Sequence, residues 1–239
     1  MEQWNGYEAK KYIIDGREAI VVFPKISPNG RWALKTEYFD AFPDVQIALL
    51  NRGYHIAHIK TRTRWYVPED NASKAALAEF MHTELGLSDK CVIIGMSCGG
   101  MQGIYFGAEY PQYVSCMYLD APVVNLLSCP FGVGRELEDN AMIDEFVAAT
   151  GKSLADMLSY RNHPLDRLPE LAGHGIPVIL VSGDSDTVVP YCENGIYIDK
   201  IYRENNCIIR TIIKPGGDHH PHSLPDNTPI LSFIAEYDI

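Results

Sequence analysis

Short runs of hydrophobic residues alternate along the chain with longer segments whose apolar positions have helical spacing. Uninterrupted runs, such as residues 91–94 and 178–182, are typical of parallel strands that are buried on both faces. From Tyr54 onward, predicted strands and helices alternate to the end of the 239 residues. This pattern predicts a single α/β domain, residues 1–239, with a mostly parallel central sheet flanked by helices.

The same pattern places the individual elements. An Asp-Gly turn between strands at 7–14 and 18–23 predicts an antiparallel hairpin at the start of the sheet. Further strands are predicted at residues 54–59, 91–94, 114–119, 178–182 and 208–214. Helices are predicted at residues 44–51, 72–85, 98–109, 193–205 and 229–236.

The alternation lapses between residues 121 and about 175. Four prolines there separate helix-like pieces at 137–149 and 154–160. The segment is too short to build a rich core of its own. We therefore predict a helical cap, or lid, inserted into the single domain at about 121–175.

Composition narrows the class of protein. With 31 acidic against 20 basic residues, the net charge of −11 disfavours nucleic acid and anionic membrane surfaces as partners. No apolar run approaches the roughly 20 residues of a membrane span, and we expect no secretion signal. The six cysteines are scattered without a Cys-x-x-Cys pair, which predicts reduced thiols in a cytoplasmic protein. Assembly into a homo-oligomer stays open.

The strongest chemical motif is Gly-x-Ser-x-Gly at residues 95–99. It follows a predicted buried strand and opens a predicted helix, which is the setting of a nucleophile elbow. In that turn the serine backbone is strained and its hydroxyl projects above the sheet, so Ser97 is the candidate nucleophile. Gly99, Gly103 and Gly107 recur every four residues, so one face of the predicted helix has no side chains, which indicates close packing against the sheet.

A serine nucleophile needs a base, and the base needs an acid to orient it. Aspartates at 184 and 186 follow the predicted strand 178–182, and histidines at 219, 220 and 222 follow the predicted strand 208–214. The carboxyl ends of parallel strands meet at one edge of a sheet, where ligands bind. The chain order Ser, Asp, His is the order expected of an α/β-hydrolase sheet.

With these motifs the chain resembles the α/β-hydrolase superfamily over nearly its whole length. The segment Gly-Asp-x-Asp-x-x-Val-Pro at residues 183–190 is similar to the superfamily's acid loop, whose second acidic position usually serves. The resemblance therefore implies Asp186 as the acid. Asp184 and Asp120 remain alternatives, the latter because some members supply the acid from the end of that strand.

For the base, the resemblance implies His219, with His220 next and His222 beyond Pro221. The superfamily usually has Gly-His at this point, whereas this chain has Asp218-His219. A metal site of Asp218, His219 and His222 lacks a fourth ligand at suitable spacing, so no metal and no cofactor is predicted.

Two backbone N–H groups are expected to stabilise the oxyanion. One belongs to Cys98, directly after the nucleophile, and the resemblance places the other in the loop after Phe23. Pro24 has no N–H, which leaves Lys25 or Ile26 as the donor. A thiol at a helix N-terminus can have a lowered pKa, but Cys98 is assigned a backbone role.

The loop after the predicted strand 54–59 supplies candidate substrate contacts. Arg62 or Arg64 could hold a substrate carboxylate, although exposed arginines are commonly just solvated. Trp32, Trp65 and Tyr191 are candidates for an aromatic wall, with packing as the alternative for each.

Segments such as Arg52-Gly53-Tyr54-His55 and residues 219–224 are similar to those of a group of mostly uncharacterised bacterial α/β hydrolases. That group usually has arginine and tryptophan where this chain has Cys98 and Cys129. This likeness supports the fold but implies no substrate.

Together the motifs predict a serine hydrolase that cleaves a small carboxylic ester through an acyl-enzyme intermediate. A peptidase or amidase and an acyltransferase would use the same three residues. A binding protein on a hydrolase scaffold is the alternative from another class.

Overall fold

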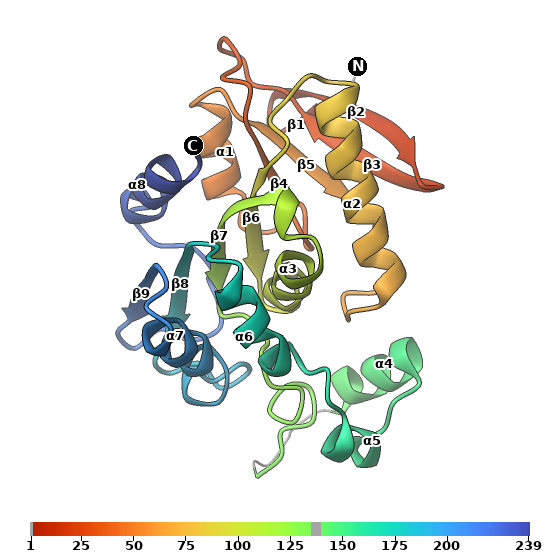
Figure 1. Cartoon of the computed structure of the whole chain (residues 1–239), viewed down its shortest axis with the longest axis vertical. Coiled ribbons are helices and arrows are strands. Elements are labelled where there is room, and N and C mark those ends of the chain that lie inside the picture. The colour runs from red at the N-terminus through yellow and green to blue at the C-terminus, as the bar shows by residue number, and fades with distance from the viewer. Residues whose placement is uncertain (1, 135–139) are drawn as a thin grey trace.

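The computed structural model describes residues 2–134 and 140–239, and the strands of this part form one nine-stranded sheet. The strands are β1 (Glu2–Trp4), β2 (Tyr7–Ile14), β3 (Arg17–Val22), β4 (Trp32–Lys35), β5 (His55–Ile59), β6 (Cys91–Met96), β7 (Val114–Asp120), β8 (Val178–Gly183) and β9 (Ile209–Lys214). Their order across the sheet is β1-β2-β3-β5-β4-β6-β7-β8-β9. The pairs among β1, β2, β3 and β5 are antiparallel, and those from β5 to β9 are parallel. Figure 1 shows the resulting twisted sheet.

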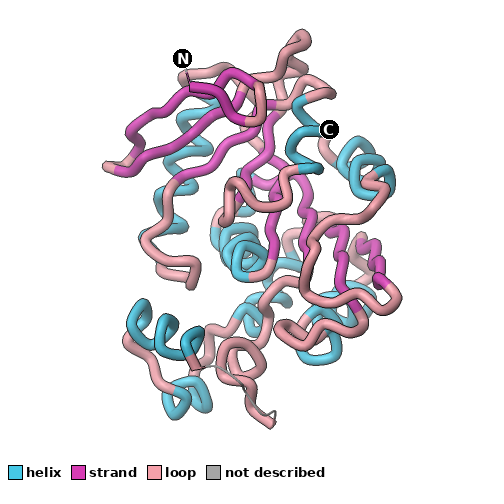
Figure 2. Tube along the Cα trace, turned by 180° about the vertical axis from the view of Figure 1, so that it is seen from behind, coloured by secondary structure: helices cyan, strands magenta, loops and turns pink. Residues whose placement is uncertain are grey.

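The central strands are hydrophobic throughout because successive side chains face two different cores. In β6, Cys91 and Ile93 pack into one core, and Val92 and Ile94 pack into the other. Helices on the first side are α2 (Pro68–Thr83), α3 (Cys98–Glu109), α6 (Pro164–Gly173) and α7 (Gly195–Glu204). Helices on the second side are α1 (Asp44–Leu50) and α8 (Thr228–Tyr237). Figures 1 and 2 show the two layers from opposite sides. Two short 3₁₀ helices lie at Pro111–Tyr113 and Tyr191–Glu193.

Helices α4 (Ala141–Thr150) and α5 (Leu154–Ser159) stand apart from the sheet, below it in Figure 1. A third hydrophobic cluster, which includes Phe146 and Met157, joins them to residues near the start of α3. Helix α6 differs, because its Leu168 and Leu171 pack into the first core. Within the segment 121–175 that is predicted as a cap, α6 thus belongs to the layer on the sheet. Residues 137–139 of the predicted helix 137–149 lie outside the described residues.

The sequence pattern predicts most elements within a few residues but misses two strands and helix α6. Strand β1 is three residues long, and β4 is a four-residue strand whose members are all buried. Strand β4 lies between β5 and β6 at the centre of the sheet. Because the sequence pattern does not predict β4, it also does not predict that the loop after β4 lies beside Ser97.

Among the described residues, no helix has the length and hydrophobicity that a bilayer crossing requires. The six cysteines, all of which are described, form no disulfide with one another.

The close packing of α3 against the sheet makes Gly103 intolerant of a side chain. A Cβ atom at Gly103 would lie 2.8 Å from Cγ2 of the buried Ile93. We expect Gly103→Ala to lower the free energy of unfolding by about 1–3 kcal/mol, despite the better helix propensity of alanine. Gly173→Ala in α6 is the matched control, because a Cβ atom there meets nothing within 4 Å. Urea unfolding measures both, and equal effects would contradict this account of α3 packing.

Candidate active site

Ser97 lies on a sharp turn between β6 and α3. Its backbone has φ 53° and ψ −121°, a conformation that is strained for a residue with a side chain. The neighbouring glycines make the turn compatible with its surroundings. A Cβ atom at Gly95 would lie 2.8 Å from the Cα of Gly100, and one at Gly99 would lie 3.1 Å from Oγ1 of Thr36. The turn therefore has the geometry of a nucleophile elbow.

The structure brings the hydroxyl of Ser97 to the predicted base and acid. His219 Nε2 lies 3.1 Å from Ser97 Oγ, and His219 Nδ1 lies 2.8 Å from Asp186 Oδ2. The other carboxylate oxygen of Asp186 accepts the backbone N–H groups of Val188 and Val189, at 2.9 and 2.8 Å. Ser97, His219 and Asp186 thus form a continuous hydrogen-bonded chain.

The environment of Asp186 favours its charged form. Burial by itself would raise the pKa of this carboxyl, but the hydrogen bond and electrostatic attraction from His219 and the two backbone N–H groups together lower it. An ionised Asp186 holds the proton of His219 on Nδ1. This leaves the Nε2 lone pair directed at Ser97.

The alternative acids are occupied elsewhere. Asp184 is exposed, and its side chain accepts the backbone N–H of Gly216 at 2.7 Å. Asp120 is fully buried at the end of β7, where it accepts the Tyr118 hydroxyl at 2.6 Å and lies 3.0 Å from Nδ1 of His222. His222 is therefore paired with Asp120, and His219 with Asp186.

A cavity of about 340 Å³ opens beside the serine hydroxyl. Its lining is mainly apolar. Besides Ser97 and His219, its polar members are Tyr38, Arg64, His220 and His222. The lining residues are Tyr38, Ala41, Phe42, Arg64, Met96, Ser97, Cys98, Cys129, Met142, Val188, His219, His220 and His222. Met142 lies on α4, so the segment that stands off the sheet forms part of the wall.

No protein-family model matches the sequence, and no curated protein matches it. Solved structures do match the fold. A puromycin-hydrolyzing peptidase of Mycobacterium tuberculosis superposes with a TM-score of 0.73 and 15% identity, over 97% of this chain and 38% of that one. An acylaminoacyl peptidase of Pyrococcus horikoshii gives a TM-score of 0.68 and 13% identity, over 90% of this chain and 38% of that one. MPT51 of M. tuberculosis gives a TM-score of 0.67 and 14% identity, over 96% of this chain and 97% of that one.

The chain has the α/β-hydrolase fold. It spans about two fifths of the length of the two peptidases, which carry further sequence, and nearly the whole length of MPT51.

Within this α/β-hydrolase fold, the assignment of Lys25 as an oxyanion donor is wrong. Strand β3 runs antiparallel to β5, and its last residue Val22 pairs with Ile56 near the start of β5. The loop that holds Lys25 and Ile26 therefore leaves the sheet at the edge opposite Ser97. Lys25 is exposed there, and its ammonium group packs over the ring of Tyr7.

The loop that faces Ser97 follows β4 instead. Residues 36 and 37 of this loop abut Gly99, and Tyr38 lines the cavity with a φ of 53°. On the other side of the serine, the N–H of Cys98 belongs to the first turn of α3 and has no partner within that helix. The thiol of Cys98 is a different matter. Burial raises its pKa to about 11, against the opposing effect of Tyr38 and Arg64, so it is not an activated thiol.

Of the residues predicted to contact substrate, the structure brings Arg64 to the cavity. Its guanidinium also pairs with Glu145 on α4. The other four lie elsewhere. Trp32 is buried at the start of β4, with its indole N–H donated to Ser88 O, and Trp65 is buried in the third cluster. Arg62 and Tyr191 do not line the cavity either. The spacing of Phe42, Met96, Met142 and Val188 gave no sequence signal that they would share a wall.

A buried lysine contacts Met96, the residue that precedes Ser97. Lys35 at the end of β4 is fully buried, and its Nζ contacts the carbonyl oxygen of Ala41 at 3.2 Å and the sulfur of Met96 at 3.0 Å. Burial lowers its pKa to about 7, although the charge of Asp120 opposes the change.

This shift predicts a pH-dependent stability. Folded Lys35 loses its proton near pH 7, whereas the unfolded side chain keeps it to about pH 10.5, so the unfolded state binds more protons between these values. The free energy of unfolding contributed by this residue should then rise with pH, by about 1 kcal/mol per unit above pH 7. Lys35→Met should lack this rise in urea unfolding between about pH 6 and pH 9. Parallel pH profiles for the two proteins would contradict it.

Proposed function

We propose that the protein is a serine hydrolase that cleaves small carboxylic esters through an acyl-enzyme intermediate. The observation that carries this proposal is the hydrogen-bonded chain from Ser97 through His219 to Asp186. The Ser97 end of this chain lies at a mainly apolar cavity. A hydroxyl, an imidazole and a buried carboxylate in this order are the minimum for nucleophilic acyl transfer.

The chemistry follows from the geometry. As Ser97 Oγ attacks the ester carbonyl carbon, its proton passes to His219 Nε2, and Asp186 stabilises the imidazolium that forms. His219 then gives this proton to the leaving alkoxide, which departs as the alcohol. Water repeats the sequence on the acyl-enzyme, with His219 again as base, and releases the carboxylic acid.

The oxyanion of each tetrahedral intermediate needs hydrogen-bond donors that are in place before reaction. We assign the N–H of Cys98 as one donor and the backbone N–H of Tyr38 as the second, in place of Lys25. The Tyr38 N–H donates to Glu37 Oε1 over a long 3.4 Å, and the oxyanion would replace this contact. The Tyr38 hydroxyl is engaged with the Cys98 thiol and the Arg64 guanidinium, which favours the backbone group for this role.

The lining of the cavity favours an ester with a small apolar acyl group. Met96, Met142 and Val188 offer no hydrogen-bonding partner for a polar chain, and Glu145 already neutralises Arg64. No carboxylate occurs among the described lining residues, so the cavity has no partner for the ammonium group of an aminoacyl substrate. The peptidases with similar folds are much longer chains than this one.

The identity of the nucleophile can be tested with a fluorophosphonate probe, which labels activated serines. Wild-type protein should be labelled on Ser97 and should hydrolyse short-chain aryl esters faster than aminoacyl amides. Ser97→Ala should lose both labelling and turnover, while Ser185→Ala, an exposed serine in the acid loop, should retain both. Absence of labelling in the folded wild type would favour a non-catalytic binding protein.

The identity of the acid can be tested by three separate substitutions. Asp186→Asn should lower kcat by roughly 10⁴-fold, because an amide no longer fixes the tautomer or stabilises the charge of His219. Asp184→Asn should change kcat by less than about tenfold, because the Asp184 carboxylate is exposed and contacts Ser185 and Gly216, away from His219. A larger loss of kcat in Asp120→Asn than in Asp186→Asn would refute the assignment of Asp186.

A further inference from the structure

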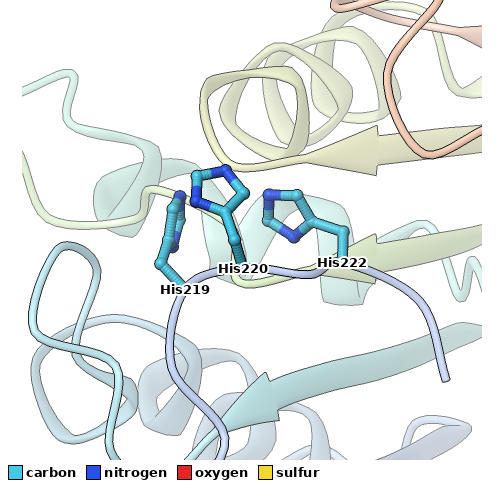
Figure 3. Close-up of side chains that lie close together, drawn as sticks. All are labelled: His219, His220 and His222. Atoms are coloured by element: carbon cyan, nitrogen blue, oxygen red, sulfur yellow. The ribbon is translucent and has the colours of Figure 1, made fainter. Parts of the chain in front are cut away.

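Three histidines on the loop that follows β9 line the cavity beside Ser97. His219, His220 and His222 each present a ring nitrogen, and these three atoms lie within 4.8 Å of one another. The ring centroids are 4.7, 5.0 and 5.1 Å apart, and the rings are nearly perpendicular to each other. Figure 3 shows the three side chains gathered on one side of the loop. The hydrolytic chemistry uses His219 and leaves His220 and His222 without a role.

Two of the three rings are oriented by buried carboxylates. His219 Nδ1 is held by Asp186 at 2.8 Å, and His222 Nδ1 is held by Asp120 at 3.0 Å. In each ring the hydrogen-bonded Nδ1 leaves Nε2 as the available lone pair. A carboxylate behind each imidazole is the arrangement that typically orients histidine ligands of metal ions and raises their basicity. His220 is exposed and stacks on Phe42, with ring centroids 5.4 Å apart.

We propose that His219, His220 and His222 bind a zinc-type divalent cation, and that this ion inhibits the enzyme reversibly. Three neutral imidazoles with one open position suit Zn²⁺, whereas Mg²⁺ and Ca²⁺ prefer oxygen ligands. In a tetrahedral zinc site the ligand nitrogens lie about 3.4 Å apart, so the cluster closes slightly around the ion. The exposed position of His220 makes this adjustment available to the loop.

Inhibition follows from the single lone pair of His219 Nε2. In the structure this lone pair faces the Ser97 hydroxyl at 3.1 Å and is the acceptor of its proton in the proposed reaction. A bound cation takes the same lone pair, so His219 cannot act as base until the ion leaves. The inhibitory effect rests on the proposed function, whereas metal binding itself does not.

Metal binding can be measured without any substrate. Metal-free protein is titrated with Zn²⁺ in competition with a chromophoric chelator, and we expect one zinc ion per chain. His220→Ala and His222→Gln should each weaken binding at least about tenfold, because removal even of a group behind a ligand has an effect of that size. His82→Gln and Cys192→Ser, which alter an exposed histidine and an exposed thiol outside the cluster, should bind zinc as the wild type does.

Inhibition is measured as the rate of fluorophosphonate labelling of Ser97. Stoichiometric Zn²⁺ should lower this rate at least about tenfold, a chelator should restore it, and Mg²⁺ should leave it unchanged. The effect of zinc on each variant is compared with the zinc-free rate of that same variant. Equal zinc affinity in His220→Ala and wild type would overturn the site, and a labelling rate unaffected by bound zinc would overturn the inhibition. Protein that binds zinc through these histidines but is never labelled would refute the hydrolase function and leave the metal site standing.

Discussion

The close approach of backbone segments around Ser97 is the constraint on which the rest of the site depends. A Cβ atom at Gly100 would lie 2.5 Å from Cβ of Pro122, so α3 can begin where it does only with glycine at this position. The Ser97 N–H donates to Asp120 O at 2.9 Å, and the N–H of Val123 donates to Ser97 O at 3.1 Å. The strained serine is therefore clamped on both sides by β7 and the segment after it. Because β6, β7, β8 and β9 run parallel, their carboxyl ends meet at this edge, and the loops that hold Asp186 and His219 return to it.

Two ionisable side chains, Asp120 and Lys35, are fully buried behind this edge of the sheet. Asp120 accepts hydrogen bonds from Tyr118 and from the N–H of Ser223 and is paired with His222, while Lys35 lies close enough to feel its charge. Charges at such depth are tolerated when they are paired and hydrogen-bonded. Since Ser223 and His222 belong to the loop that also holds His219, Asp120 anchors this loop from below. Asp120 thus holds the loop in place through His222 and Ser223, whereas Asp186 contacts His219 directly.

The sequence was sufficient to predict the fold class and the three side chains that the structure brings together, because chain order and strand ends decide both. It was insufficient for β4, a four-residue strand that ends in Lys35, a residue that reads as solvent-exposed. The partners that make its burial tolerable, such as Met96 and Asp120, are distant in sequence. The wrong prediction at Lys25 follows directly, because a sheet without β4 places the second predicted oxyanion donor in the loop after β3. Whether Trp32 or Trp65 packs or lines a cavity likewise depends on the tertiary arrangement, which composition does not encode.

The wall of the cavity is built from two parts of the chain, one attached to the sheet and one outside it. Ser97, His219 and the loop after β4 are tied to the sheet, whereas Met142 on α4 and Cys129 belong to the segment that stands off it. Substitutions in that segment can reshape this wall of the cavity while leaving the strand ends untouched. Ligand preference can then change through substitutions in the outlying helices while the strand ends stay as they are, which makes these helices the natural targets for directed evolution.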